Sequence, residues 1–236
     1  MLYQTDSYLR EFQATVTAVD PEAHAVLLDR TAFYPGGGGQ PADGGTLTWQ
    51  STSLPVERAR KGAEGIWHTL SAEASLPPVG ANITGQIYWP HRYALMRTHT
   101  AMHILCGVVF RDYGALVTGG DMEPLHGRMD FEFESLTKDL VSVIEAAVNR
   151  EVTAARPVKV AILPREEAFQ IPDLIRTKIN LLPPEISHIR TIELSGLDLQ
   201  ADGGTHVHNT SEVGHMRVVD YKSKGRINKR IYVELD

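Results

Sequence analysis

Residues 90–114, PHRYALMRTHTAMHILCGVVFRDYG, decide how the chain is organised. Pro90 suits the first turn of a helix, where a missing backbone N–H is tolerated, and Gly114 suits the position just past the last turn. The stretch therefore predicts one long helix. Because a pattern of short strands gives way to this helix, we place a domain boundary near residue 89, with one domain over residues 1–89 and a second over residues 90–236.

The segment before the helix contains several short runs of strand-forming residues, separated by Gly, Pro and Ser. In the run FQATVTAVD, Phe12, Ala14 and Val16 fall on one face, as in a half-buried strand. Short strands at this spacing are typical of a small β-barrel and not of βαβ units. The expected strands are residues 12–20, 25–30, 45–50, 54–62, 65–70 and 82–89.

The segment after the helix mixes both kinds of pattern. Residues 136–154 carry an apolar stripe at helical spacing, whereas residues 127–134, GRMDFEFE, alternate as a strand. Further strands are expected over residues 158–163, 188–194, 215–223 and 230–235, with a short helix over 165–171. The predicted fold class is α+β: a small N-terminal β-barrel followed by an α/β domain with a mostly antiparallel sheet.

The composition narrows the class of protein. The chain has 236 residues, 42% of them hydrophobic, and a formal net charge of −6. This acidic balance argues against a general nucleic-acid coat protein, although it leaves room for a local basic patch. The single cysteine, Cys106, permits no intrachain disulfide. There is no signal-like N-terminus and no apolar run of about 18 residues, so we expect a soluble cytoplasmic protein.

The predicted helix carries two histidines four residues apart, His99 and His103. Side chains at this spacing project from one helical face about 6 Å apart and can share a metal ion. The residue after His99 is Thr100, so the general-base glutamate of an HExxH metallopeptidase is missing. The pair alone is equally compatible with two histidines that bind no metal. Cys106 is either a soft third ligand or, the interpretation we favour, a small buried core residue.

A second candidate group lies in Asp202-Gly-Gly-Thr-His206. The two glycines indicate a loop that turns back, in which Asp202 is either a turn cap or a metal ligand. Two ligands from a helix and two from a tight loop commonly complete a tetrahedral zinc site. Because both motifs occur in one chain, we favour the metal interpretation.

Residues 34–41, YPGGGGQP, form the most unusual stretch of the N-terminal segment. They lack the Gly-Lys-Ser/Thr of a phosphate-binding P-loop. Glycine has no Cβ and lets the backbone approach a ligand closely. The Gln40 amide that ends the loop can both donate to a carbonyl and accept from a water or an ammonium group.

These motifs together resemble one family. DRTAFY at residues 29–34 running into GGGGQPADGG at 36–45, then the His99/His103 pair, then DGGTH at 202–206, are similar to the editing domain of alanyl-tRNA synthetase. The chain most resembles the freestanding alanyl-tRNA editing proteins of the AlaX family, in their medium-sized form. The resemblance spans nearly the whole chain. It implies an editing domain shared with threonyl-tRNA synthetase, and deacylation in trans of tRNA(Ala) mischarged with serine, with glycine as a second candidate.

The resemblance also implies a zinc site, with one Zn²⁺ per chain. The family's ligands fall on His99, His103 and His206, and its usual cysteine is replaced by Asp202. Three alternatives follow for the fourth position: Asp202 itself, a water molecule, or another residue such as Cys106 or His208. We expect three histidine ligands with Asp202 as the fourth. The ion would activate a water, polarise the ester carbonyl, or anchor the substrate.

The resemblance implies Thr31 and Gln40 as the catalytic residues of the N-terminal segment and the glycines of the loop as substrate contacts. Thr31 matches a threonine that the family uses and would meet the hydroxyl of serine, since a polar group left unmatched disfavours alanine. The glycine loop would lie as a lid over the aminoacylated adenosine through Gly37, Gly38 and Gly39, delivering Gln40. Arg128 is a further candidate contact, with a surface ion pair as the alternative.

Positive charge gathers near the C-terminal end of the sequence. Lys222, Lys224 and Arg226 surround Gly225 in an expected hairpin, with Lys229 and Arg230 beyond it. We expect this group to contact the tRNA substrate, although a solvated hairpin is the alternative. Two other functions remain open from the sequence: an inactive tRNA-binding or regulatory homologue, and a zinc hydrolase of small esters.

Overall fold

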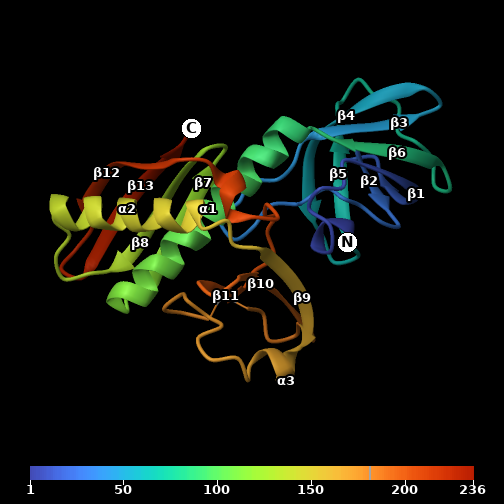
Figure 1. Cartoon of the computed structure of the whole chain (residues 1–236). Helices are drawn as coiled ribbons and strands as arrows, with labels where there is room; N and C mark the ends of the chain where they lie inside the picture. The colour runs from blue at the N-terminus through green and yellow to red at the C-terminus, as the bar shows by residue number, and fades with distance from the viewer. Residues whose placement is uncertain (181) are drawn as a thin grey trace. The chain divides into compact units, whose positions relative to one another are not determined.

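The computed structural model describes residues 1–180 and 182–236 (Figure 1). The chain forms two compact units, Met1–Ala94 and Leu95–Asp236. None of the helices in the described residues is long and apolar enough to cross a membrane. The α+β class predicted from the sequence is confirmed, with an antiparallel barrel first and helices with antiparallel sheets after it.

The first unit is a closed barrel of six antiparallel strands in the order β1-β2-β5-β4-β3-β6. Inward-facing apolar side chains such as Phe12, Val16, Leu47 and Ile83 fill its interior. At Gly85 a Cβ atom would lie 2.3 Å from the Phe12 ring, so only glycine fits beside it. The elements are η1 (Leu2–Gln4), β1 (Glu11–Asp20), β2 (Ala25–Leu28), β3 (Gly45–Trp49), β4 (Thr52–Lys61), β5 (Ile66–Leu70) and β6 (Asn82–Ile87).

The glycine loop of this unit is a closed turn. All four glycines, residues 36–39, have positive φ angles, between 58° and 134°, which L side chains rarely adopt. The backbone N–H of Gly37 donates to the Gln40 carbonyl (3.0 Å) and the N–H of Gln40 donates to the Gly37 carbonyl (2.9 Å). The Tyr34 hydroxyl also donates to the Gly37 carbonyl (2.9 Å). The glycines are therefore needed for the backbone conformation itself.

A buried ion pair fixes the chain on both sides of this turn. The side chains of Arg92 and Asp43 are both 0% exposed and form a two-point contact, with Nε donating to Oδ1 at 2.9 Å. Arg92 also donates to the carbonyls of Ala32 (2.6 Å) and Ser7 (2.9 Å), and Asp43 accepts from the Tyr34 N–H (2.6 Å). The two arms of the glycine loop are thus held to each other and to residue 92.

The second unit contains two sheets and most of the long helix. A four-stranded sheet has the order β12-β13-β8-β7, and a three-stranded sheet has the order β11-β10-β9. Figure 1 shows α2 lying across the four-stranded sheet, and side chains of α2 accept hydrogen bonds from β12 backbone N–H groups. The elements are α1 (Trp89–Tyr113), β7 (Val117–Glu123), β8 (His126–Glu132), α2 (Lys138–Thr153), β9 (Val158–Pro164), α3 (Arg165–Ala168), β10 (His188–Leu194), β11 (Asp198–Ala201), η2 (Thr210–Val213), β12 (Met216–Ser223) and β13 (Asn228–Leu235).

We predict that Arg92→Met destabilises the first unit strongly. Removing one partner of a buried pair leaves an uncompensated charge, which costs about 3–5 kcal/mol. Calorimetric or urea unfolding measures the loss. Arg30→Met is the matched control, because Arg30 pairs with Asp29 at the surface and its side chain is 60% exposed; that change should cost at most about 1 kcal/mol. Equal losses of stability in the two variants would contradict a stabilising role of the buried Arg92–Asp43 pair.

Candidate metal centre

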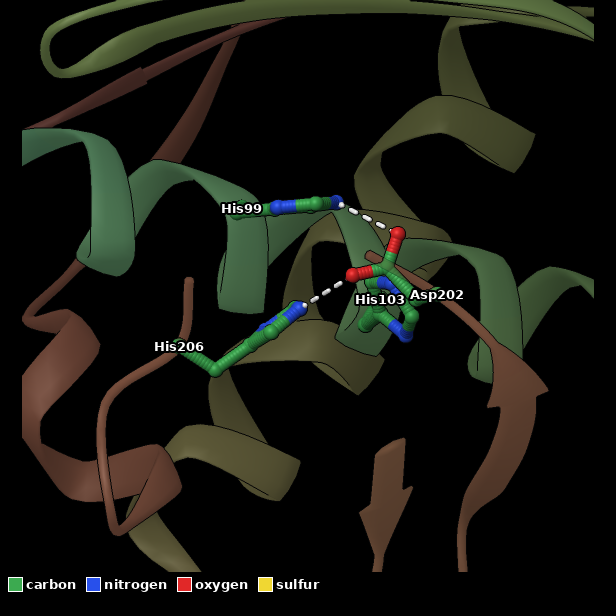
Figure 2. A group of neighbouring side chains, drawn as sticks. All are labelled: His99, His103, Asp202 and His206. Atoms are coloured by element: carbon green, nitrogen blue, oxygen red, sulfur yellow. Dashed lines mark hydrogen bonds and ion pairs between the residues drawn. The ribbon is translucent and has the colours of Figure 1, made fainter. Parts of the chain in front are cut away.

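Four side chains from two distant parts of the second unit converge in one place. His99 and His103 project from α1, while Asp202 and His206 come from the loop after β11. Each offers one ligand atom, and these atoms all lie within 4.8 Å of one another. Figure 2 shows the Asp202 carboxylate between the rings of His99 and His206. Its Oδ1 lies 2.9 Å from Nε2 of His206 and its Oδ2 lies 3.6 Å from Nε2 of His99.

The loop is shaped by Asp202 and docked by a threonine of the helix. The Gly204 N–H donates to Asp202 Oδ1 (2.8 Å), which closes the turn that the Asp-Gly-Gly sequence predicts. On α1, the Thr100 hydroxyl lies 3.2 Å from Nδ1 of His206 and accepts from the Val207 N–H at 3.3 Å. Thr100, the residue that stands where a metallopeptidase has its glutamate, therefore attaches the loop to the helix.

A second carboxylate orients His103 from outside the group. Oδ2 of Asp198 lies 3.1 Å from Nδ1 of His103, and the Asp198 side chain is 0% exposed. Gln200 Nε2 donates to the same carboxylate oxygen (2.7 Å), and Arg176 Nε lies 3.4 Å from the other. A carboxylate on one ring nitrogen of a histidine fixes the tautomer and leaves the other nitrogen for a metal ion.

Burial and neighbouring charges set the protonation of the group. Burial lowers the pKa of His99 to about 4. The Asp202 charge acts to raise this pKa, whereas His103 and Arg190 lower it further. Burial and the nearby His99 hold the pKa of His206 well below its usual value. Burial alone would raise the pKa of Asp202, but the adjacent imidazoles hold it well below its usual range. The group thus presents neutral imidazoles at His99 and His206 beside an ionised carboxylate.

His103 behaves differently from the other two histidines. Burial lowers its pKa, but the hydrogen bond and charge of Asp198, together with Asp202, outweigh burial and raise the pKa above its usual value. Protons therefore compete with a metal ion for this ring more than for the other two, which makes affinity dependent on pH.

The donor set fits a borderline divalent metal ion. Three imidazole nitrogens and one carboxylate oxygen, gathered within 4.8 Å, are the ligand types and the number that a tetrahedral zinc site uses. Two alternative ligands do not join this group in the described part of the chain. Cys106 is 2% exposed, and burial raises the pKa of its thiol, as in an inert core cysteine. His208 is exposed, and its backbone N–H donates to Glu212.

The candidate substrate residues of the N-terminal segment all lie in the first unit. Thr31 is 1% exposed and Gln40 is 2% exposed. The Thr31 hydroxyl lies 2.9 Å from Nε2 of His68, a contact the sequence did not indicate. Gly37, Gly38 and Gly39 lie in the closed turn described above.

The basic candidates lie in the second unit, on its four-stranded sheet. Lys222, Lys224 and Arg226 are exposed at the hairpin between β12 and β13. Lys229 is buried at 6% and donates to two hairpin carbonyls.

The arginines of this sheet are engaged in ion pairs. Arg230 pairs with Asp130 (2.6 and 2.8 Å), and Arg128 lies 3.3 Å from Asp121. Of the expected basic group, Lys222, Lys224 and Arg226 are exposed at the hairpin, and Lys222 Nζ lies 4.7 Å from the centroid of the Tyr232 ring.

Comparisons with known proteins agree with this architecture. A family model described as tRNA synthetases class II (A) matches residues 5–91, and one described as the threonyl and alanyl tRNA synthetase second additional domain matches residues 189–232. The alanyl-tRNA editing protein AlaX-M of Saccharolobus solfataricus is 39% identical over 98% of this chain and 96% of its own length. The chain belongs to the AlaX-M family. This confirms the resemblance inferred from the sequence motifs.

Other relatives extend the comparison. The AlaX-M protein of Methanosarcina acetivorans is 35% identical over 100% of this chain and 98% of its own length. The alanine–tRNA ligase of Thermofilum pendens is 36% identical over 94% of this chain but only 24% of the ligase. The chain thus matches these AlaX-M proteins over nearly their full length and corresponds to about a quarter of the ligase.

We predict that the metal-free protein loses stability as the pH falls from about 6.5 towards 4. The folded-state pKa values of His99 and His206 are depressed, so in this window only the unfolded chain takes up their protons. Each such histidine contributes about 1.4 kcal/mol per pH unit. The raised pKa of His103 adds stability that is fully present below about 6.5, so it does not alter the slope in this window.

Urea unfolding in the presence of a chelator, repeated across this pH range, measures the slope. His99→Gln should reduce it by about one proton. The matched control is His188→Gln, which should leave the slope in place because that side chain is exposed. A stability that is flat or rises on acidification would contradict the buried, neutral state of the two histidines.

Proposed function

We propose that this protein is a trans-editing hydrolase that deacylates mischarged tRNA(Ala), chiefly Ser-tRNA(Ala), with Gly-tRNA(Ala) as a second substrate. One observation carries the proposal: His99, His103, Asp202 and His206 converge in a chain that matches proteins named alanyl-tRNA editing protein over nearly their full length. The reaction is hydrolysis of the ester between the aminoacyl carbonyl and the terminal ribose.

The metal proposed for this group is Zn²⁺, held by the three histidines and Asp202. When bound, zinc supplies either a water of lowered pKa or a Lewis acid for the ester carbonyl. The protein's own residues arrange the ligands: Asp198 keeps the proton on Nδ1 of His103, and Thr100 holds the His206 ring against the helix. Arg190 donates to the Asp202 backbone carbonyl (3.0 Å), which fixes the backbone from which the carboxylate side chain projects.

We further propose that Thr31 and Gln40 contact the aminoacyl group, with Gly37, Gly38 and Gly39 against the terminal adenosine. The support is chemical: a hydroxyl and an amide can recognise a serine side chain and an ester carbonyl. The rigid, closed turn at residues 36–39 supports a fixed role for that backbone. Arg128 remains a proposed contact, although its guanidinium is already close to Asp121.

The tRNA backbone is proposed to contact the hairpin between β12 and β13. Lys222, Lys224 and Arg226 are exposed there, in a chain whose overall charge is −6. An acidic protein has to gather its phosphate contacts locally, and such contacts weaken as salt rises.

The proposed function is tested by deacylation of Ser-, Gly- and Ala-tRNA(Ala), each with and without a chelator. We expect release of serine and glycine, with alanine retained. Chelation should abolish the activity and added zinc should restore it, because the metal would supply the activated water or the Lewis acid for the ester carbonyl. Metal analysis of the purified protein provides the stoichiometry.

The controls separate the two other functions. Hydrolysis of free serine esters at the rate of Ser-tRNA(Ala) would indicate a small-ester hydrolase. No deacylation by the zinc-loaded protein, together with retained tRNA binding, would indicate an inactive binding homologue. Cleavage of Ala-tRNA(Ala) as fast as the serine form would contradict an editing role.

Replacing Asp202 tests the fourth ligand. We predict that Asp202→Asn weakens zinc binding by about tenfold or more, because it replaces the anionic donor among these four residues with a neutral amide. Asp202→Cys should retain zinc, since thiolate is a good zinc ligand. Competition against a chromophoric chelator measures both affinities. Unchanged affinity in Asp202→Asn would place Asp202 outside the metal shell and leave its turn-capping role.

A further inference from the structure

A buried histidine of the barrel holds the Thr31 hydroxyl. His68 lies on β5, its side chain is 0% exposed, and its ring packs edge-on against Phe33 at 5.3 Å between centroids. Nε2 of His68 lies 2.9 Å from the Thr31 hydroxyl. Nothing in the sequence motifs indicated this residue, and the proposed chemistry does not yet use it.

The surroundings of the ring decide which group donates. Nδ1 of His68 lies 3.4 Å from the backbone carbonyl of Val26, which can only accept a hydrogen bond. A neutral imidazole carries one proton, so Nδ1 donates to that carbonyl and Nε2 is left as an acceptor. The hydrogen bond at 2.9 Å therefore runs from the Thr31 hydroxyl to His68. The ring is neutral because burial lowers its pKa to about 4.

The lone pairs of the Thr31 hydroxyl oxygen are also partly occupied. Its oxygen accepts from the Phe33 N–H at 3.1 Å, and the Thr31 backbone carbonyl accepts from the Leu2 N–H at 2.8 Å. A hydroxyl has one proton and two lone pairs. With the proton directed to His68 and one lone pair to Phe33, a single lone pair remains for any further partner.

We propose that His68 is a positioning residue that makes Thr31 an acceptor only, and thereby selects an aminoacyl side chain that brings its own hydroxyl proton. The inference rests on the proposed function and deepens it. The serine side chain can donate its hydroxyl proton to the remaining lone pair, whereas the side chains of alanine and glycine have no donor. The same arrangement prevents Thr31 from stabilising an oxyanion, since that needs a donor, so Thr31 acts in specificity and not in bond cleavage.

Two amide substitutions separate the roles of the ring nitrogens. In His68→Gln the side-chain amide reaches the position of Nε2 and can accept from Thr31. In His68→Asn the amide reaches only the position of Nδ1, and the Thr31 proton loses its acceptor. We expect His68→Asn to lower the ratio of kcat/KM for Ser-tRNA(Ala) over Gly-tRNA(Ala) by roughly tenfold, the size typical of one buried hydrogen bond. His68→Gln should restore most of the ratio.

A cycle with Thr31→Val tests whether the effect passes through Thr31. In that background His68→Asn should change the ratio no further. A merely structural role of His68 would slow both substrates by the same factor and leave the ratio unchanged, which would overturn the proposal. So would a further loss of discrimination in the Thr31→Val background.

A spectroscopic measurement determines which group donates in the Thr31–His68 hydrogen bond, and it does not depend on enzymatic activity. In ¹⁵N-histidine-labelled protein, the ring signals missing from His68→Gln identify His68. We expect them to show a protonated Nδ1 and a bare Nε2. A protonated Nε2 would make Thr31 the acceptor of this bond and overturn the inference. Wild-type protein that deacylates neither substrate would instead refute the proposed function, and the tautomer would still report on the Thr31–His68 bond.

Discussion

A largely buried carboxylate facing three imidazoles is the constraint on which the second unit depends. The Asp202 side chain is 15% exposed, and a charge in such a place is costly unless partners surround it. His206 lies on the same loop, but His99 and His103 lie on α1, about a hundred residues earlier in the chain, so the charge on this loop is stabilised partly by that helix. Thr100 completes the contact by binding the loop from between the two histidines. These interactions thus connect α1 to the loop after β11 and bring the four candidate ligand atoms together.

Patterns over short stretches of the sequence were enough to predict the long helix and the turn at Asp202. The expected helix over residues 90–114 is observed as α1, and Gly114 ends it with a positive φ of 65°. The histidine spacing and the Asp-Gly-Gly turn act over a few residues, so the sequence alone could indicate them. β7 was missed because Gly119 and Gly120 are poor strand formers, and a register shift interrupts the pairing there. Thr100, Asp198 and His68 were missed because each matters through a partner that only the fold supplies.

The sequence and the structure give different reasons for the four glycines of the loop. From the sequence, four residues without Cβ indicated a backbone that lies close to a ligand. The structure gives a further reason, since each glycine has a positive φ and the turn is closed by its own hydrogen bonds. The Arg92–Asp43 pair then holds both arms of the loop, so this glycine-rich segment is anchored on each side by buried hydrogen bonds.

The candidate ligand group of His99, His103, Asp202 and His206 contains no thiolate, which bears on oxidative damage. A thiolate ligand is open to oxidation by peroxide, and a metal site built on it is lost when the sulfur is oxidised. Carboxylate and imidazole donors resist that reaction. The one cysteine of the chain, Cys106, is buried, and burial raises the pKa of its thiol, so little of the reactive thiolate forms. A metal ion held by this group of carboxylate and imidazole donors would not be lost through oxidation of a sulfur ligand.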